Sequence, residues 1–290
     1  MTIDHISAGR DFIQRDGRLL ERRLADVLFD RTDPRSVVDA LRGYQNPDGG
    51  FGHALEPDTR CPLSLPIYTE FAFETLVAAG AIGTDGALDM VQRAADQLLT
   101  VAAAAGAVAL ADPAIEQYPR AAHWTEWTYQ PALNPTAGLA GALHALGAQH
   151  EWLDRATVAC WSMLDRDGVP GDAHGLSEVL HFLAHVPDSD RADAWSERIR
   201  EALPTVQMLH LDPATDGYGL TPLDLAPSPN SRWRQLFGDS VIDGHLQRMI
   251  GSHDDDGGWP VAWTPPGAAA LVEWRAIITL RNIRVLRAYG

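Results

Sequence analysis

Lysine is absent from this chain of 290 residues, so all 23 basic side chains are arginines, set against 39 acidic residues. The formal net charge is −16. Nucleic-acid binding without sequence preference needs a basic surface that neutralises phosphates, and this composition does not supply one. We therefore expect no nucleic-acid partner.

Cysteine and long hydrophobic runs are also scarce. Cys61 and Cys160 are too few for a disulfide framework, and their spacing fits no zinc-ligand pattern. The longest apolar stretch, residues 101–111, is far too short to cross a bilayer, and the first residues lack the hydrophobic segment of a signal peptide. These absences predict a cytoplasmic protein with no stable membrane span.

Two short segments far apart in the chain have the same pattern. Residues 45–52 and 253–260 each contain a polar residue, an acidic turn, two glycines and an aromatic, and an apolar run follows each after a proline-containing loop. Weaker copies lie at residues 167–171 and 216–219. The spacing indicates repeats of roughly 50 residues, with a degenerate copy expected near residues 104–133. The chain is therefore expected to be an array.

Hydrophobic periodicity near 3.6 recurs along the chain, whereas strict alternation over a strand length does not. Segments 86–104, 191–208 and 240–251 are amphipathic, and segments 68–79, 136–147 and 176–186 are apolar over most of their circumference. This alternation predicts an all-α fold, an (α/α) toroid of five to six helical hairpins in a single domain over residues 1–290. The expected helices are 6–28, 34–44, 66–79, 86–104, 135–147, 150–164, 175–186, 191–208, 230–237, 240–251 and 267–288.

The repeated motif resembles that of the terpenoid cyclase and protein prenyltransferase superfamily, in which a Gln and an Asp-Gly-Gly-aromatic motif separate an outer from an inner helix. Residues 45–52 match in order and spacing, and residues 253–259 match except that His253 replaces the glutamine. The glycines permit positive φ and the aspartates accept backbone N–H bonds, so we interpret Asp48, Asp256, Phe51 and Trp259 as scaffold.

Several active-site motifs of this superfamily are missing. The Asp-x-Cys pair of the zinc prenyltransferases and the Asp-x-Asp-Asp acid motif of class II cyclases are both absent, and the run Asp254 to Asp256 lies inside a repeat loop. Three consecutive acids do not easily ligate one divalent ion. We expect no metal and no cofactor.

The resemblance and the expected cavity together suggest carboxylic-acid catalysis. Glu70, Glu178 and Glu273 lie on mostly apolar helices, where burial raises the pKa of a carboxyl and lets it act as a general acid. The alternative for each glutamate is an interhelical hydrogen bond or an ion pair with arginine. Glu56 and Asp58, in the loop before an inner helix, are either an acid and base pair or helix caps paired with Arg60.

Aromatic and histidine side chains near the expected mouth of the ring are candidates for substrate binding, because aromatic faces stabilise a developing cation. These candidates are His53, Tyr68, His123, Trp124, Trp127, Tyr129, His174, Tyr218, Trp233, Trp263 and Trp274.

The favoured function is a terpenoid-cyclase-like enzyme, an isomerase or lyase that protonates a small apolar isoprenoid or polyene substrate. The alternatives are a carbohydrate-active enzyme on the same fold, with two carboxylates about 5 to 10 Å apart, and a non-catalytic ligand-binding module. The sequence leaves the oligomeric state open.

Overall fold

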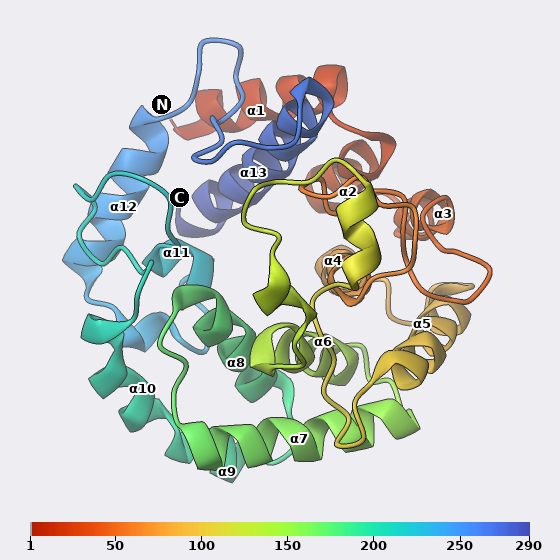
Figure 1. The fold of residues 1–290 in the computed structure, drawn as a ribbon. Helices are drawn as coiled ribbons and strands as arrows, with labels where there is room; N and C mark the ends of the chain where they lie inside the picture. Colours follow the sequence, from red (N-terminus) through yellow and green to blue (C-terminus); the bar gives the residue numbers. More distant parts are fainter. Residues whose placement is uncertain (1) are drawn as a thin grey trace.

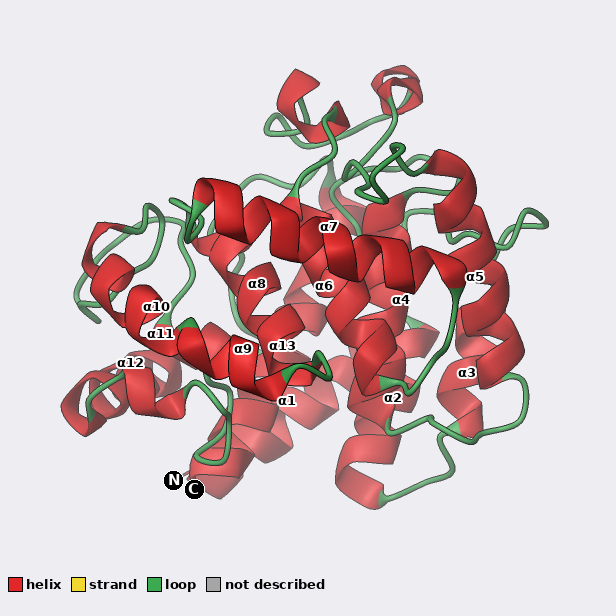
Figure 2. Ribbon diagram, turned by 90° about the horizontal axis from the view of Figure 1, so that it is seen from below, coloured by secondary structure: helices red, strands yellow, loops and turns green. Residues whose placement is uncertain are grey.

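The computed structural model describes residues 2–290, and helices are the regular secondary structure of this part of the chain. The described residues contain isolated β-bridges but no strand, and Figure 2 shows helices joined only by loops. No helix in this part of the chain is long and apolar enough to cross a membrane.

The thirteen α-helices of the described residues form two concentric layers of a ring (Figure 1). The outer layer is α1 (Thr2–Asp16), α3 (Arg35–Arg42), α5 (Ala87–Val101), α7 (Glu151–Asp167), α9 (Ser189–Ala194), α10 (Ser196–Ala202) and α12 (Asp239–Gly251). The inner layer is α2 (Leu19–Asp30), α4 (Pro66–Ala79), α6 (Leu133–Ala145), α8 (Ala173–His185), α11 (Pro222–Leu225) and α13 (Ala268–Tyr289).

The ring is closed, since α13 packs against both α1 and α2 at the opposite end of the chain. Outer and inner elements alternate along the sequence and make six hairpins, which confirms the all-α toroid-like fold. In Figure 2, α7 crosses in front of α6 and α8, as an outer helix covering two inner ones. Because every inner helix is reached from the outer layer in the same way, the inner helices run parallel and begin at one mouth of the ring.

Close backbone approach between α6 and α8 forms the tightest part of the inner layer. A Cβ on Gly141 would lie 2.8 Å from the backbone of His181, so only glycine fits there without displacement. Helix α6 is buried along most of its length, as its nearly continuous apolar sequence predicts.

The first repeat loop is held by its own backbone. Asn46 N–H donates to the Gly50 carbonyl (2.8 Å), Gly49 N–H donates to the Asn46 carbonyl (3.0 Å), and Asp48 Oδ1 accepts from Gly50 N–H (3.0 Å). Gly49 has φ +94°, in the region that favours glycine. Phe51 is fully buried.

The last repeat loop reproduces this network bond for bond. Asp254 N–H donates to the Gly258 carbonyl (2.8 Å), Gly257 N–H to the Asp254 carbonyl (3.0 Å), and Asp256 Oδ1 accepts from Gly258 N–H (3.0 Å). Gly257 has φ +91°, and Trp259 is buried. These contacts confirm the scaffold interpretation of the motif.

A third copy lies at residues 102–108, slightly before the expected 104–133. Ala103 N–H donates to the Ala107 carbonyl (2.9 Å), Gly106 N–H donates to the Ala103 carbonyl (2.8 Å), and Gly106 has φ +98°. Of the residues in the sequence motif, this copy keeps only the glycine with positive φ. The Gln130-Pro131 segment, which was expected to end this copy, belongs instead to the connection that precedes α6.

Three expected helices differ from the structure. The predicted helix 6–28 is broken at Gly17 and Arg18, where Arg18 is extended (ψ 164°), and the break places α1 in the outer layer and α2 in the inner one. The predicted helix 191–208 is divided into α9, α10 and the 3₁₀ turn η3 (Leu203–Thr205), which contains Pro204.

The fifth inner element was also placed wrongly. The predicted helix 230–237 contains only the 3₁₀ turn η4 (Arg234–Leu236), and α11 takes the inner position. Helix α11 is a single turn stabilised by a capping box between Thr221 and Asp224. Its four residues are too few for a periodic signal, which is why the pattern missed it.

Gly257→Ala tests whether the repeat loops hold the ring together. A Cβ at this positive-φ position would lie 2.5 Å from the Ala8 carbonyl oxygen of α1, so we expect a loss of about 1–3 kcal/mol in unfolding free energy. Urea denaturation measures it. Gly171→Ala is the control, since nothing lies within 4 Å of that position, and equal stability of the two variants would contradict the prediction.

Candidate active site

Asp58 is the centre of a polar cluster at the mouth. Its Oδ1 accepts hydrogen bonds from the indole N–H groups of Trp274 (2.8 Å) and Trp263 (3.1 Å), and its Oδ2 lies 3.5 Å from His123 Nε2. The side chain is buried, and burial raises the pKa of Asp58 against the opposing effect of the two indoles and of His123.

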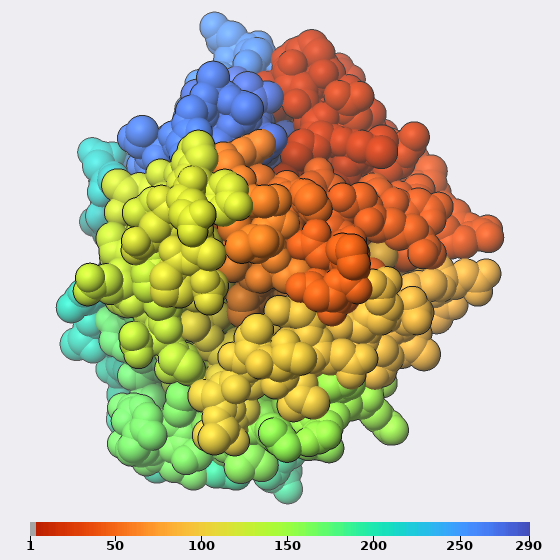
Figure 3. All heavy atoms as spheres, turned by 45° about the vertical axis from the view of Figure 1, so that its right-hand side comes forward, coloured from red at the N-terminus to blue at the C-terminus, as the bar shows by residue number. Residues whose placement is uncertain are grey.

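The segment before α6 brings His123 to this cluster. It contains the 3₁₀ turns η1 (Pro113–Gln117) and η2 (Glu126–Tyr129), and it is joined to the loop before α4 by the bonds from Ala121 N–H to the Asp58 carbonyl (2.7 Å) and from Arg60 N–H to the Pro119 carbonyl (2.9 Å). Figure 3 shows this yellow segment against the orange loop, with the blue C-terminal part above them.

Four aromatic rings continue inward from Asp58. Trp263 packs edge-on against Trp274 (centroids 4.9 Å) and Tyr218 (5.3 Å), and Phe71 meets Trp274 at 6.5 Å. Tyr218 is stacked on His174, with its hydroxyl 2.8 Å from His174 Nε2. These aromatic side chains come from α4, α13 and two loops. Closure of the circle of helices therefore brings them together.

Glu70 of α4 and Glu178 of α8 meet across α6 at Gly138. One oxygen of each carboxyl lies where a Cβ on residue 138 would stand, so the missing side chain creates the space for the pair. Glu70 Oε1 is buried and no N–H or O–H group of the described residues donates to it. Two ionised carboxylates this close repel each other, so the contact favours a proton on at least one of them.

Burial is the main cause of the raised pKa values in this pair. It raises the pKa of Glu178 to about 8, with a further effect from Glu74, while the hydrogen bond with Glu70 opposes the shift. Burial also raises the pKa of Glu70 well above its ordinary value, followed by the charges of Glu178 and Glu74. The pair therefore keeps at least one proton at neutral pH.

Deeper in the ring, charged side chains of both signs face one another. Glu74 lies one turn beyond Glu70, and burial raises its pKa against the opposing charges of Arg281 and Arg284 from α13. Arg281 pairs with Asp224 of α11 at 3.1 Å. Solvent reaches Glu74 and Arg284 although burial shifts their pKa values, so they line an accessible interior.

The structure separates the predicted acids into two groups. Asp58, Glu70 and Glu178 face the interior, whereas Glu273 forms an ion pair with Arg60 (Oε1 to Nη2 3.3 Å) and has the structural role given as its alternative. Glu56 is buried and accepts the Asp58 backbone N–H (3.1 Å), so it shapes the loop that positions Asp58. Burial raises the pKa of Glu56 well above its ordinary value.

Two of the predicted binding aromatics are part of the packed core. Tyr68 is fully buried and its hydroxyl donates to the Thr59 carbonyl (2.8 Å). Trp233 is buried and donates from its indole to the Leu180 carbonyl (2.8 Å). Neither side chain is available to a ligand.

The remaining candidates lie around the mouth. Trp124 is buried beside His123, and Trp127 is 58% exposed with its indole N–H donating to the His123 carbonyl (3.1 Å). Tyr129 donates to Glu116 (3.0 Å) at the surface, and His53 is exposed in the first loop with φ +59°.

Sequence reasoning missed the roles of Gly138, Glu74, Arg284 and the inward position of Arg281. Helical spacing carried the signal for three of them, since Glu74 follows Glu70 by four residues and the two arginines follow Trp274 by seven and ten. The role of Gly138 depends on contacts between three helices, which no local pattern encodes.

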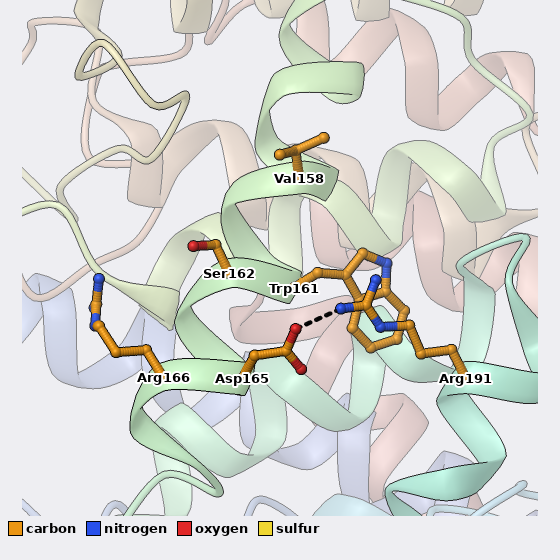
Figure 4. Close-up of a pocket in the computed structure, with 6 residues that line it drawn as sticks. All are labelled: Val158, Trp161, Ser162, Asp165, Arg166 and Arg191. Atoms are coloured by element: carbon orange, nitrogen blue, oxygen red, sulfur yellow. Dashed lines mark hydrogen bonds and ion pairs between the residues drawn. The ribbon is translucent and has the colours of Figure 1, made fainter.

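A groove on the outer surface lies away from this interior (Figure 4). It is lined by Val158, Trp161, Asp165 and Arg191, and the Arg191 guanidinium lies over the Trp161 ring (4.2 Å) while pairing with Asp165 (2.6 Å). Its two central charged groups, Asp165 and Arg191, already pair with each other, and it contains no predicted site residue.

Comparison with known proteins supports the fold. No family model matches the chain, and no curated protein does. A crystal structure of a protein from Actinoplanes is similar over 99% of both chains, with a TM-score of 0.58 and 16% sequence identity. At this identity the similarity concerns the fold alone.

The Glu70–Glu178 pair predicts an unusual dependence of stability on pH. The pKa of Glu178 is about 8 in the folded state against 4.5 ordinarily. Between these pH values the folded state holds a proton that the unfolded state has lost, so the free energy of unfolding falls as pH rises. Glu178→Gln removes this loss, so its stability relative to wild type should grow by up to about 1.4 kcal/mol per pH unit there.

Thermal or urea denaturation of both proteins between pH 5 and pH 8.5, with Glu201→Gln as a surface control, measures this difference. A constant difference across the range would show that Glu178 titrates normally in the folded protein.

Proposed function

We propose that this protein is a terpenoid-cyclase-like enzyme, an isomerase or lyase, in which the Glu70–Glu178 pair protonates an unsaturated isoprenoid or polyene substrate. The observation that carries the proposal is the meeting of the two carboxyls over Gly138, with a proton held at neutral pH. A general acid must carry its proton at the working pH, and here burial provides that condition.

The same pair also stabilises the product of proton donation. When the proton of Glu178 passes to a carbon–carbon double bond, the carbon keeps the new C–H bond and a carbocation forms at the neighbouring carbon. The hydroxyl of Glu70 then donates to the new carboxylate of Glu178, which lowers the energy of the ionised pair. Transfer of a proton from a carbon next to the cation back to the Glu178 carboxylate forms the new double bond, completes an isomerisation and restores the acid.

The aromatic rings between the acid pair and the mouth suit a cationic intermediate. Trp274, Trp263, Phe71 and Tyr218 are in mutual contact, and aromatic faces attract cations. Asp58 fixes the two indole rings through their N–H groups, so their faces remain available. We assign Asp58 a positioning role in this proposal.

The alternatives fit this geometry less well. A glycosidase needs two carboxyls about 5 to 10 Å apart, and Glu70 and Glu178 are in direct contact. A binding module has no need of convergent buried acids, whose desolvation costs stability.

Incubation with polyprenyl diphosphates, squalene and an oligosaccharide panel, followed by mass spectrometry, tests the proposal. We expect conversion of an unsaturated isoprenoid, reduced about 10²- to 10⁴-fold in Glu178→Gln and Glu70→Gln and unchanged in the outer-layer control Glu201→Gln. The rate should fall as pH rises through about 8, where the pair loses its acidic proton.

Turnover of an oligosaccharide in place of an isoprenoid would contradict the substrate class. Full activity of both glutamine variants would contradict the assignment of the acid.

A further inference from the structure

We infer that Arg281 and Arg284 form a binding site for an oxyanion, the phosphate or carboxylate group of a ligand that enters the ring. The site lies on the inner face of α13, deeper than the aromatic mouth. It goes beyond the proposed proton transfer, because anion binding requires no reaction.

Arg284 is the first observation. It forms no hydrogen bond or ion pair with the residues that the structure describes, although it stands inside a ring of helices and is reached by solvent. Two other arginines near the interior do have partners: Arg60 pairs with Glu273, and Arg281 pairs with Asp224. A guanidinium that solvent reaches and that has no partner keeps its N–H donors free for an anion from solution.

Arg281 is the second observation. It lies three residues before Arg284 on one helix face, so the two guanidinium groups are neighbours of like charge. Burial is the main cause that lowers the pKa of Arg284, and the repulsion by Arg281 adds to it. Arg281 uses one nitrogen on Asp224 Oδ1, which leaves other donors of its fork unoccupied.

Glu74 does not remove the need for an anion. The charges of Arg281 and Arg284 lower the pKa of Glu74, but burial raises it more strongly. Glu74 makes no ion pair with either arginine in the described structure. A group with two or three acceptor oxygens, in contrast, accepts from two guanidinium forks together. Phosphate and carboxylate share this chemistry.

The position of the site sets the orientation of a ligand. Trp274, Arg281 and Arg284 share a face of α13, with the tryptophan at the mouth and the arginines further in. An anionic group on the arginines would leave the rest of the ligand beside Glu70, Glu178 and the aromatic rings. Anion binding therefore places the body of a ligand next to the acid pair.

Binding of inorganic phosphate and of butyrate, measured by calorimetry at constant ionic strength, tests the inference. The proteins compared are the wild type, Arg284→Gln, Arg281→Gln and the control Arg198→Gln, whose arginine lies exposed on the outer helix α10 over Trp195 (4.7 Å). We expect wild type and control to bind alike, and each interior variant to bind at least about tenfold more weakly.

Stronger binding of phosphate than of butyrate would identify a phosphate group, and the reverse a carboxylate. Because Arg284→Gln relieves the repulsion with Arg281, it should melt at or above the wild-type temperature without ligand, which shows that the variant is folded. Absence of binding by the wild type, or equal binding by Arg284→Gln, would overturn the inference.

Discussion

Contact between three of the glycine loops and the next outer helix is the constraint on which this ring depends. A Cβ on Gly49 would collide with the Arg93 carbonyl of α5, one on Gly106 would lie 2.7 Å from Arg155 of α7, and one on Gly257 would meet Ala8 of α1. At these three places the loop of one hairpin packs on the outer helix of the following hairpin. The last loop packs on the first outer helix, so the same contact that joins neighbours also closes the circle.

Closure has a direct consequence for the interior. Glu70, Glu178 and Arg284 come from three inner helices far apart in sequence, and closure of the ring brings these helices round one interior. Rigid elements can keep a pair of carboxyls in contact where flexible ones would let them separate. The cost of burying these groups is offset by the extensive apolar packing around them.

The sequence predicted the architecture well because repetition encodes it locally. Residues 45–52 and 253–260 carry every hydrogen-bonding group of the loop, and the apolar circumference of residues 136–147 marks an inner helix without reference to any other segment. It predicted short elements poorly. Helix α11 is fixed by one capping box and by burial between neighbours, and the break at Gly17 exists because α1 and α2 occupy different layers.

The candidate site shows the same division between local and tertiary information. Glu70 and Glu178 were identifiable as acids on apolar helices, but the sequence does not show that they meet, because that depends on Gly138 and on the closeness of α6 to α8. Glu273 carried an equal signal and is paired with Arg60, which lies 213 residues away. A buried carboxyl thus becomes a candidate acid only when no arginine pairs with it, as at Glu70 and Glu178. The same interior contains Arg284, which has no ion-pair partner among the described residues.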